Sequence, residues 1–427
     1  MKTFLLVMRR IVVILFMTGL FVSTFAAQAV PMAELPFFPI VGFNFLWLPD
    51  EEMIREQAEM GLTLVTVYGD KELDWCGKYG LKAIVYRHHA INRYLHDADP
   101  EKLESDIADM VNAFKSHKAF YTLQFTDEPG KSVYDGYAKT FEAIKKAAPQ
   151  TPVYTNFYPS WSLPIQHGYA DYEEYVETFC QLFAKYPNQP FIYDNYRNKD
   201  TRLNPVERIA SFLENLDTVA RITGKHGISF WITVLGAQHD HFREPTAADL
   251  DFQVFSSLAY GAKGIGYFTT CSHQNLNFQG GPFNYLGDKT PTFYNMRELN
   301  YRVRMLAPVL NKLTFQGAYY SLTAEDEVDF NKFPMHKRLP GKQIESIKSD
   351  RGNCSFLVGE LKDDQGDDWV IVVNLNMEEV AYFTATLLNE GKQLQHFNSY
   401  VGKLFPKNHV DPWLRPGQGK LYKVVEQ

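Results

Sequence analysis

Short apolar runs alternate with helical patterns along the first two thirds of the chain. Apolar runs bounded by polar or turn-forming residues predict buried strands, and apolar residues repeated every three to four positions predict amphipathic helices. One such helical stripe is formed by Leu103, Ile107, Val111 and Phe114. The runs that predict strands are residues 39–46, 62–68, 81–86, 120–125, 153–157, 191–193, 228–235 and 264–268.

The spacing of these eight runs predicts the fold class. Their starts lie roughly 20 to 40 residues apart, which is the length of one βα unit. Eight such units predict an α/β chain folded as a (β/α)8 TIM barrel over residues 30–312, with its functional site on the loops that follow the strands. An open, doubly wound sheet is the alternative, but no glycine-rich dinucleotide fingerprint follows the first strand.

The pattern changes after residue 312. Short candidate strands separated by Gly, Asp and Asn turns cover residues 316–322, 355–358, 368–375, 381–387 and 420–425. Many short strands with turn signals between them are typical of antiparallel sandwiches. We therefore expect a small all-β C-terminal sandwich domain over residues 313–427.

The N-terminus carries the features of an export signal. Lys2, Arg9 and Arg10 precede an apolar run over residues 11–25, and Ala27-Gln28-Ala29 supplies a small-x-small cleavage pattern. Residues 1–29 are predicted to be a cleaved signal peptide, which places the mature protein in the periplasm or outside the cell. A membrane span needs ~20 apolar residues, so we expect no stable membrane insertion after cleavage; an uncleaved anchor is the alternative.

Composition narrows the class of partner. The chain has 427 residues, is 45% hydrophobic and 15% aromatic, and carries a net charge of −7 without a long basic run. This excludes a disordered chain and disfavours nucleic acid as a partner. Cys76, Cys180, Cys271 and Cys354 show neither a disulfide framework nor a zinc pattern, so we expect free, buried thiols.

The strongest chemical signal lies at the end of the fourth predicted strand. The sequence there is Phe125-Thr126-Asp127-Glu128-Pro129, and two adjacent carboxylates are costly to bury unless they are paired or used. Strand alternation predicts that Glu128 projects into the barrel mouth. A carboxyl group in a semi-apolar mouth beside the anionic Asp127 holds its proton more tightly, as a general acid requires. The structural alternative is a pair that caps or braces a loop.

A second signal follows the sixth predicted strand. Here the chain reads Tyr193-Asp194-Asn195-Tyr196-Arg197, and strand parity favours Asp194 facing the mouth across from Glu128. Asp194 would then be the second catalytic carboxylate. An ion pair with Arg197 or a helix-capping role is the alternative.

Other predicted strand ends are rich in amides and aromatic rings, which together suit a polyhydroxylated ligand. The expected substrate contacts are Asn44, Trp47, Tyr68, Asn156, Tyr158, Trp161, Tyr193, Tyr196, Trp231 and Gln238. Loop packing is the alternative for each of them. His88-His89 and His239-Asp240-His241 are too closely spaced to hold one ion well, so we predict no metal and no other cofactor.

Several of these motifs together resemble bacterial glycoside hydrolase TIM barrels, most closely the family 42-like proteins (clan A-like) with a C-terminal β-sandwich. The matching stretches are Asp127-Glu128-Pro129, Tyr193-Asp194-x-Tyr196, residues 243–246, residues 258–265 and residues 414–421. The resemblance implies a carbohydrate substrate and a Glu128 that acts as acid/base. It also implies a glutamate nucleophile after the seventh strand, but the sequence there is Leu-Gly-Ala-Gln-His. Glu244 comes six residues after Gln238, far out along the loop, and would have to fold back to serve as that nucleophile.

Three functions remain open at this point. The first is a glycoside hydrolase in which Glu128 protonates the leaving oxygen, Asp194 is the partner carboxylate and Asp127 tunes Glu128. The second is a substrate-assisted N-acetylhexosaminidase in which Asp127 orients the acetamido group, because the pairing of Asp127-Glu128 with Tyr193-Asp194 is similar to glycoside hydrolase families 20 and 18. The third is a non-catalytic glycan-binding barrel. The sugar, the linkage, the stereochemical outcome and the oligomeric state stay open.

Overall fold

Eight parallel strands form a barrel in the N-terminal part of the chain. The computed structural model describes residues 32–427 except 45–49, 97–98, 187, 274–276, 327–332, 334–336 and 408, so the predicted leader 1–29 lies outside the described residues. The barrel strands are β1 (Ile40–Gly42), β2 (Leu64–Val67), β3 (Lys82–Tyr86), β4 (Phe120–Asp127), β5 (Tyr154–Asn156), β6 (Phe191–Asp194), β7 (Phe230–Leu235) and β8 (Ile265–Phe268). All eight predicted strands are confirmed.

The sheet closes on itself. Its order is β5-β4-β3-β2-β1-β8-β7-β6, so β1 pairs with β8. The two ends of this order meet where Phe157 bridges Tyr193 in parallel and the Phe157 amide donates to the Ile192 carbonyl at 2.8 Å. The predicted TIM barrel is therefore the observed architecture of this part of the chain.

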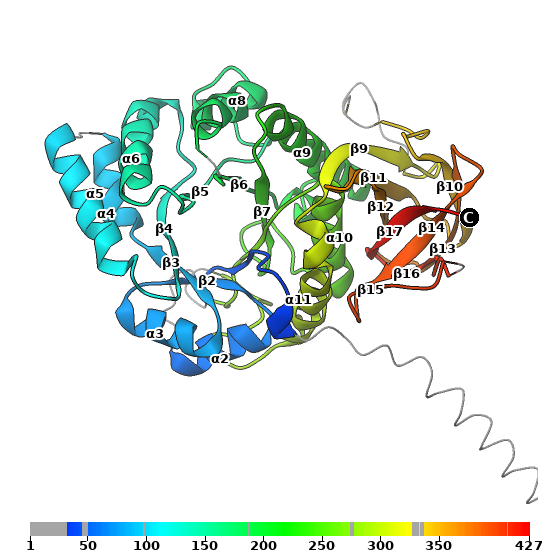
Figure 1. Ribbon diagram of the computed structural model, residues 1–427, viewed down its shortest axis with the longest axis horizontal. Coiled ribbons are helices and arrows are strands. Elements are labelled where there is room, and N and C mark those ends of the chain that lie inside the picture. The colour runs from blue at the N-terminus through cyan, green and yellow to red at the C-terminus, as the bar shows by residue number, and fades with distance from the viewer. Residues whose placement is uncertain are drawn as a thin grey trace, which may run out of the picture.

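Helices surround the barrel (Figure 1). They are α2 (Glu51–Glu59), α3 (Asp70–Tyr79), α4 (His88–Asn92), α5 (Pro100–Phe114), α6 (Tyr134–Ala147), α7 (Pro164–His167), α8 (Tyr172–Phe183), α9 (Pro205–Lys225), α10 (Ala247–Ala259) and α11 (Pro291–Leu310), with 3-10 turns η1 (Met32–Glu34), η2 (Arg93–Leu95), η3 (Lys131–Val133) and η4 (Arg197–Lys199). Side-chain caps mark several starts: Asp50, Asp171, Asn204 and Thr246 each accept a backbone N–H of the first turn. No described helix is long and apolar enough to cross a membrane.

Strand alternation separates two layers of core. Leu123 and Phe125 of β4 belong to the large core between sheet and helices. Ile84, Ile192 and Trp231, which have the opposite parity on their strands, fill the barrel interior. Because these side chains fill the barrel interior, a pocket can open at the carboxyl ends of the strands.

The C-terminal part is an antiparallel sandwich, as predicted. Its strands are β9 (Thr314–Ser321), β10 (Ile344–Arg351), β11 (Phe356–Lys362), β12 (Asp368–Asn374), β13 (Ala381–Leu387), β14 (Lys392–Asn398), β15 (Lys403–Leu404), β16 (Trp413–Leu414) and β17 (Gly419–Glu426). Six of them form a sheet in the order β15-β14-β17-β12-β11-β9, and β10-β13-β16 form the second sheet. The sequence pattern missed β10, β14 and the short β15 and β16, because β10 and β14 carry few apolar residues.

The sandwich packs against the barrel through α10, which lies between them together with α11 (Figure 1). The approach is close: a Cβ on Gly359 would lie 2.2 Å from the carbonyl oxygen of Ala259, so only glycine fits there. Leu357 and Ile371 of the six-stranded sheet join the same core cluster as the barrel helices. All four cysteines are buried and free of disulfides, as predicted.

Candidate active site

A cavity of about 570 Å3 opens at the carboxyl ends of the barrel strands. Every barrel strand, or the loop directly after it, contributes to the wall, which is where TIM barrels carry their active sites. The lining residues are Phe43, Asn44, Thr66, Tyr68, Tyr86, His89, Gln124, Asp127, Glu128, Asn156, Asp194, Tyr196, Thr233 and Phe268. The three carboxylates that the sequence singled out thus share one pocket.

The end of β4 brings two adjacent carboxylates to the same side. Regular alternation would point Asp127 and Glu128 in opposite directions, but the register of β4 against β5 shifts between Gln124 and Asp127. Glu128 then adopts a left-handed backbone conformation, with φ of 46°, and its amide donates to the Asn156 carbonyl at 2.7 Å. A left-handed non-glycine residue is strained, and such strain concentrates at functional sites.

Asn156 of β5 ties two of the carboxylates together. Its Nδ2 donates to Asp127 Oδ1 at 3.2 Å and to Asp194 Oδ1 at 3.0 Å. Asp194 is 4% exposed at the end of β6, whereas Asp127 is open to the cavity. One amide group therefore fixes the positions of two acidic side chains.

The electrostatics of the pocket favour bound protons. Burial raises the pKa of Glu128 well above its usual range, and the charges of Asp194 and Asp127 raise it further. Burial also raises the pKa of Asp194, with a further increase from Asp127, while the Asn156 hydrogen bond opposes the rise. Surrounding protein atoms raise the pKa of Asp127 in spite of its contact with the cavity. Three carboxylates so close together cannot all ionise cheaply, so one of them keeps a proton near neutral pH.

Aromatic side chains form the walls. The rings of Tyr68 and Tyr86 lie 5.4 Å apart, and the Tyr68 hydroxyl donates to the Asn44 carbonyl at 3.2 Å. On the opposite wall, the Tyr196 ring stacks on Phe268 at 6.0 Å with an interplanar angle of 20°. The pocket therefore combines flat apolar surfaces with an acidic centre.

Several expected contacts lie around the pocket in different roles. Of the residues named as substrate contacts, Asn44, Tyr68, Asn156 and Tyr196 line it. The Asn44 side chain is engaged by the protein, because its Oδ1 accepts from Thr270 Oγ1 at 2.8 Å and its Nδ2 donates to the Thr66 carbonyl at 2.9 Å. Asn44 thus braces the wall from behind.

The remaining expected contacts are not among the lining residues. Tyr193 has the wrong strand parity and lies in the core between sheet and helices, and Trp231 lies in the barrel interior, stacked on Tyr121 at 6.3 Å. Trp161 packs behind the pocket, 6.0 Å from Phe242, and Gln238 pairs its backbone with Gln279.

Tyr158 and Trp47 complete the set of expected contacts. The Tyr158 ring lies 6.0 Å from that of Tyr175, and burial and then the charge of Glu128 raise the pKa of Tyr158. Trp47 lies outside the described residues.

Sequence reasoning missed part of the wall. Tyr86 and Thr233 line the pocket without having been singled out. Tyr86 lies two residues after the interior residue Ile84, and Thr233 lies two residues after the interior residue Trp231. Counting every second residue from those interior positions would have identified both as lining residues.

The seventh strand supplies no carboxylate. Glu244 is exposed and packs against Gly280, where an added Cβ would lie 2.3 Å from Glu244 Cδ, so it does not reach the pocket. β7 contributes Thr233 instead. Within the described ranges, no three His, Cys, Asp or Glu side chains are placed to hold a metal ion.

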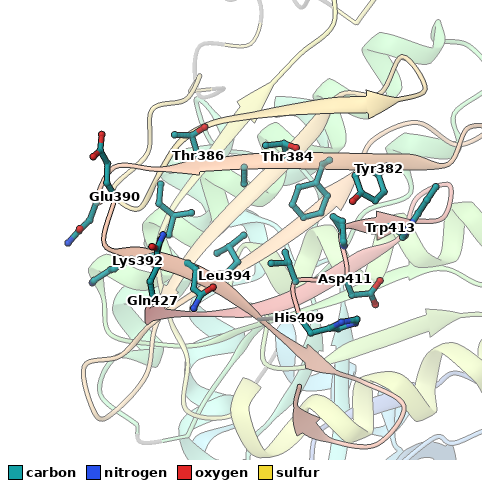
Figure 2. Close-up of a pocket in the computed structure, with 17 residues that line it drawn as sticks. Tyr382, Thr384, Thr386, Glu390, Lys392, Leu394, His409, Asp411, Trp413 and Gln427 are labelled. Atoms are coloured by element: carbon teal, nitrogen blue, oxygen red, sulfur yellow. The ribbon is translucent and has the colours of Figure 1, made fainter. Parts of the chain in front are cut away.

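A second hollow, of about 730 Å3, lies on the sandwich (Figure 2). Tyr382, Thr384 and Thr386 of β13 form one side, and Leu394 of β14 and the loop before Trp413 form the other. We call it the sandwich groove. It is larger and more open than the barrel pocket.

No family model and no curated protein matches the sequence. Solved structures do match. A structure titled "Glycoside hydrolase" aligns with a TM-score of 0.53 at 12% identity over 92% of this chain and 93% of its own. A glycoside hydrolase family 5 protein from Bacteroides vulgatus aligns with a TM-score of 0.53 at 11% identity over 92% and 90%. The chain shares its fold with glycoside hydrolases.

Some larger proteins match over a smaller share of this chain. A β-glucuronidase from an uncultured Clostridium sp. aligns at 11% identity with a TM-score of 0.44, and this chain spans 50% of its length. At such identities the likeness concerns the fold, and the narrower resemblance to family 42 stays a prediction.

Proposed function

We propose that the protein is a glycoside hydrolase that cleaves O-glycosidic bonds at the barrel mouth. The observation that carries this proposal is the presence of Glu128 and Asp194 in one cavity. Burial and the acidic neighbours raise the pKa of Glu128, which favours its protonated form. A protonated carboxyl opposite an ionised one is the pair that glycosidic cleavage requires. The shared fold of glycoside hydrolases supports the same function.

In the proposed mechanism, Glu128 donates its proton to the glycosidic oxygen as the bond from that oxygen to the anomeric carbon breaks. Asp194 supplies the second carboxylate, either by attacking the anomeric carbon or by taking a proton from the attacking water. Asn156 holds Asp194 in place through its 3.0 Å hydrogen bond. The half-buried Tyr68 and Tyr86 rings offer flat faces on which sugar rings stack.

The absence of a glutamate at the end of β7 motivates the alternative of a non-catalytic glycan-binding barrel. Digestion of a panel of oligosaccharides that differ in sugar and linkage separates the two, with released reducing ends as the readout. A hydrolase releases product from at least one member of the panel. Binding to a member without release from any of them would overturn the proposal in favour of the binding barrel.

A further inference from the structure

The barrel pocket has an unbalanced charge. Asp127, Glu128 and Asp194 line it, and its described lining includes no lysine or arginine; His89 is the one lining side chain that can carry a positive charge. Arg87, between β3 and α4, does not line the pocket, and its Nη1 donates to the carbonyls of Tyr68 at 2.7 Å and Tyr86 at 2.9 Å. The Arg87 guanidinium also lies over the Phe114 ring, 4.8 Å from its centroid, so it is engaged behind the wall.

One of the three carboxylates takes no direct part in the proposed bond cleavage and acts on it only through its charge beside Glu128. Two carboxyl groups complete the chemistry of a glycosidase. Asp127 is the third, and it is the one most open to the cavity. Among the described residues, its carboxylate accepts one side-chain hydrogen bond, from Asn156, and has no cationic partner. A carboxylate of this kind is free to meet a charge on the ligand.

Buried acceptor atoms beside Asp127 point to a ligand rich in donors. Gln124 lines the same cavity and is 8% exposed, and its Oε1 is buried without a hydrogen-bond partner. Asn156 Oδ1 is likewise buried without a partner, because the Nδ2 of the same amide serves the two aspartates. An unpaired buried acceptor is costly, and a ligand that donates to it recovers the lost hydrogen bond.

We propose that the pocket binds a sugar residue that carries a free, protonated amino group, and that Asp127 selects it. A primary ammonium supplies the missing positive charge and three N–H donors, whereas a hydroxyl or an acetamido group is neutral and offers one. A uronic acid would place a fourth carboxylate beside three others and is excluded by repulsion. The inference rests on the proposed function for the ligand being a sugar, whereas the positive charge of the ligand follows from the acidic lining of the pocket.

The test compares matched sugars and needs no knowledge of the linkage. Glucosamine, N-acetylglucosamine and glucose, with the corresponding galactose series, are titrated into the full-length protein below the pKa of the amine, and binding is followed by calorimetry or saturation-transfer NMR. The amino sugar of at least one series should bind about tenfold or more tightly than its two neutral counterparts. Since the pairing is electrostatic, the preference should shrink as salt is raised.

Variants assign the preference to Asp127. The variant Asp127→Asn should lower the preference for the amino sugar about tenfold. Asp109 is an exposed aspartate on α5, and the control variant Asp109→Asn should leave the preference unchanged. Thermal unfolding establishes that both variants are folded, and the salt dependence of the wild-type protein is independent of any variant. Equal binding of amino and neutral sugars, no binding of any of them, or an unchanged preference in Asp127→Asn would overturn the inference.

The two proposals fail separately. Hydrolysis of a neutral oligosaccharide without any amine preference would leave the glycosidase and remove the amino sugar. An amine preference without product release from any oligosaccharide would leave the amino-sugar pocket and remove the hydrolase.

Discussion

The two hollows of the molecule differ in how their charges are compensated. The sandwich groove is the larger, at about 730 Å3 against about 570 Å3 for the barrel pocket. Two of its charged groups have partners, since Asp411 accepts from Lys420 Nζ at 2.7 Å and Lys392 lies 3.8 Å from Asp368, while Glu390 is exposed to solvent. The carboxylates of the barrel pocket have neither a lysine nor an arginine among the described lining residues. Acidic groups that are buried without a lysine or arginine beside them, rather than volume, distinguish the candidate active site.

Backbone strain alone would not separate the two regions. Glu128 and Asp411 both have left-handed backbone conformations, with φ of 46° and 48°. Aspartate tolerates that conformation in a loop, and Asp411 is paired there, whereas a glutamate held in it at the end of a barrel strand has no such local reason. The strain becomes informative only where it coincides with buried, unpaired acidic groups.

The largest expected effect comes from removing the Glu128 carboxyl, with the removal of one carboxyl from the sandwich groove as the comparison. Glu128→Gln should lower kcat/KM by about 10²–10⁴-fold, because a glutamine cannot give a proton to the leaving oxygen. The measurement is the initial rate on whichever oligosaccharide the wild-type protein cleaves. The matched control is Glu390→Gln in the sandwich groove, where the exposed side chain has no expected effect beyond twofold. Full activity in Glu128→Gln, or an equal loss in both variants, would remove the distinction between the two hollows.

The pH dependence sharpens the comparison next. Burial and neighbouring charges raise the pKa of Asp194 to about 7 and that of Glu128 to about 9. Asp194 must be ionised and Glu128 protonated, so kcat/KM should fall about tenfold per pH unit below the first value and above the second. The two limbs belong to the coupled pair rather than to single residues. A pH profile of the wild-type protein measures them.

Neutralising an acid in each region tests the origin of those limbs. In Asp194→Asn the loss of a negative charge should lower the pKa of Glu128, so the alkaline limb of the residual activity moves to lower pH. Asp411→Asn should leave both limbs in place, since Asp411 is paired within the sandwich. Wild-type limbs near pH 4, the ordinary carboxyl range, would show that the pocket does not hold its protons as argued.

Most of the barrel could be predicted from the sequence because its signal is local. Each barrel strand is a buried apolar run that differs clearly from the amphipathic helix after it, so periodicity alone locates both. The strands of the sandwich were harder, since β10 reads Ile-Glu-Ser-Ile-Lys-Ser-Asp-Arg, with two apolar residues in eight. A strand that lies at the edge of a sheet needs little apolar surface, and its partners are distant in sequence.

The candidate site could be predicted as far as strand parity holds. Parity placed Asp194 correctly relative to Ile192, and it would also have placed Tyr86 and Thr233. It did not account for Asp127, which reaches the pocket because the register of β4 against β5 shifts. Nor could it show that Asn156 bridges two carboxylates, because that contact depends on the distance between strands β4, β5 and β6 in the closed barrel.

The smallest expected effect concerns the most exposed aromatic residue of the sandwich groove. Trp413 is 42% exposed, its ring lies 4.7 Å from that of Tyr382, and the Arg351 guanidinium lies 5.5 Å from its centroid. Trp413→Ala removes one edge-to-face pair and one exposed cation–π contact, so the free energy of unfolding should fall by about 1 kcal/mol. Denaturant unfolding measures that loss, and kcat/KM should stay within twofold of wild type. A tenfold loss of kcat/KM in a folded Trp413→Ala protein would make the groove part of the substrate site, and charge compensation would then no longer mark where this molecule binds its ligand.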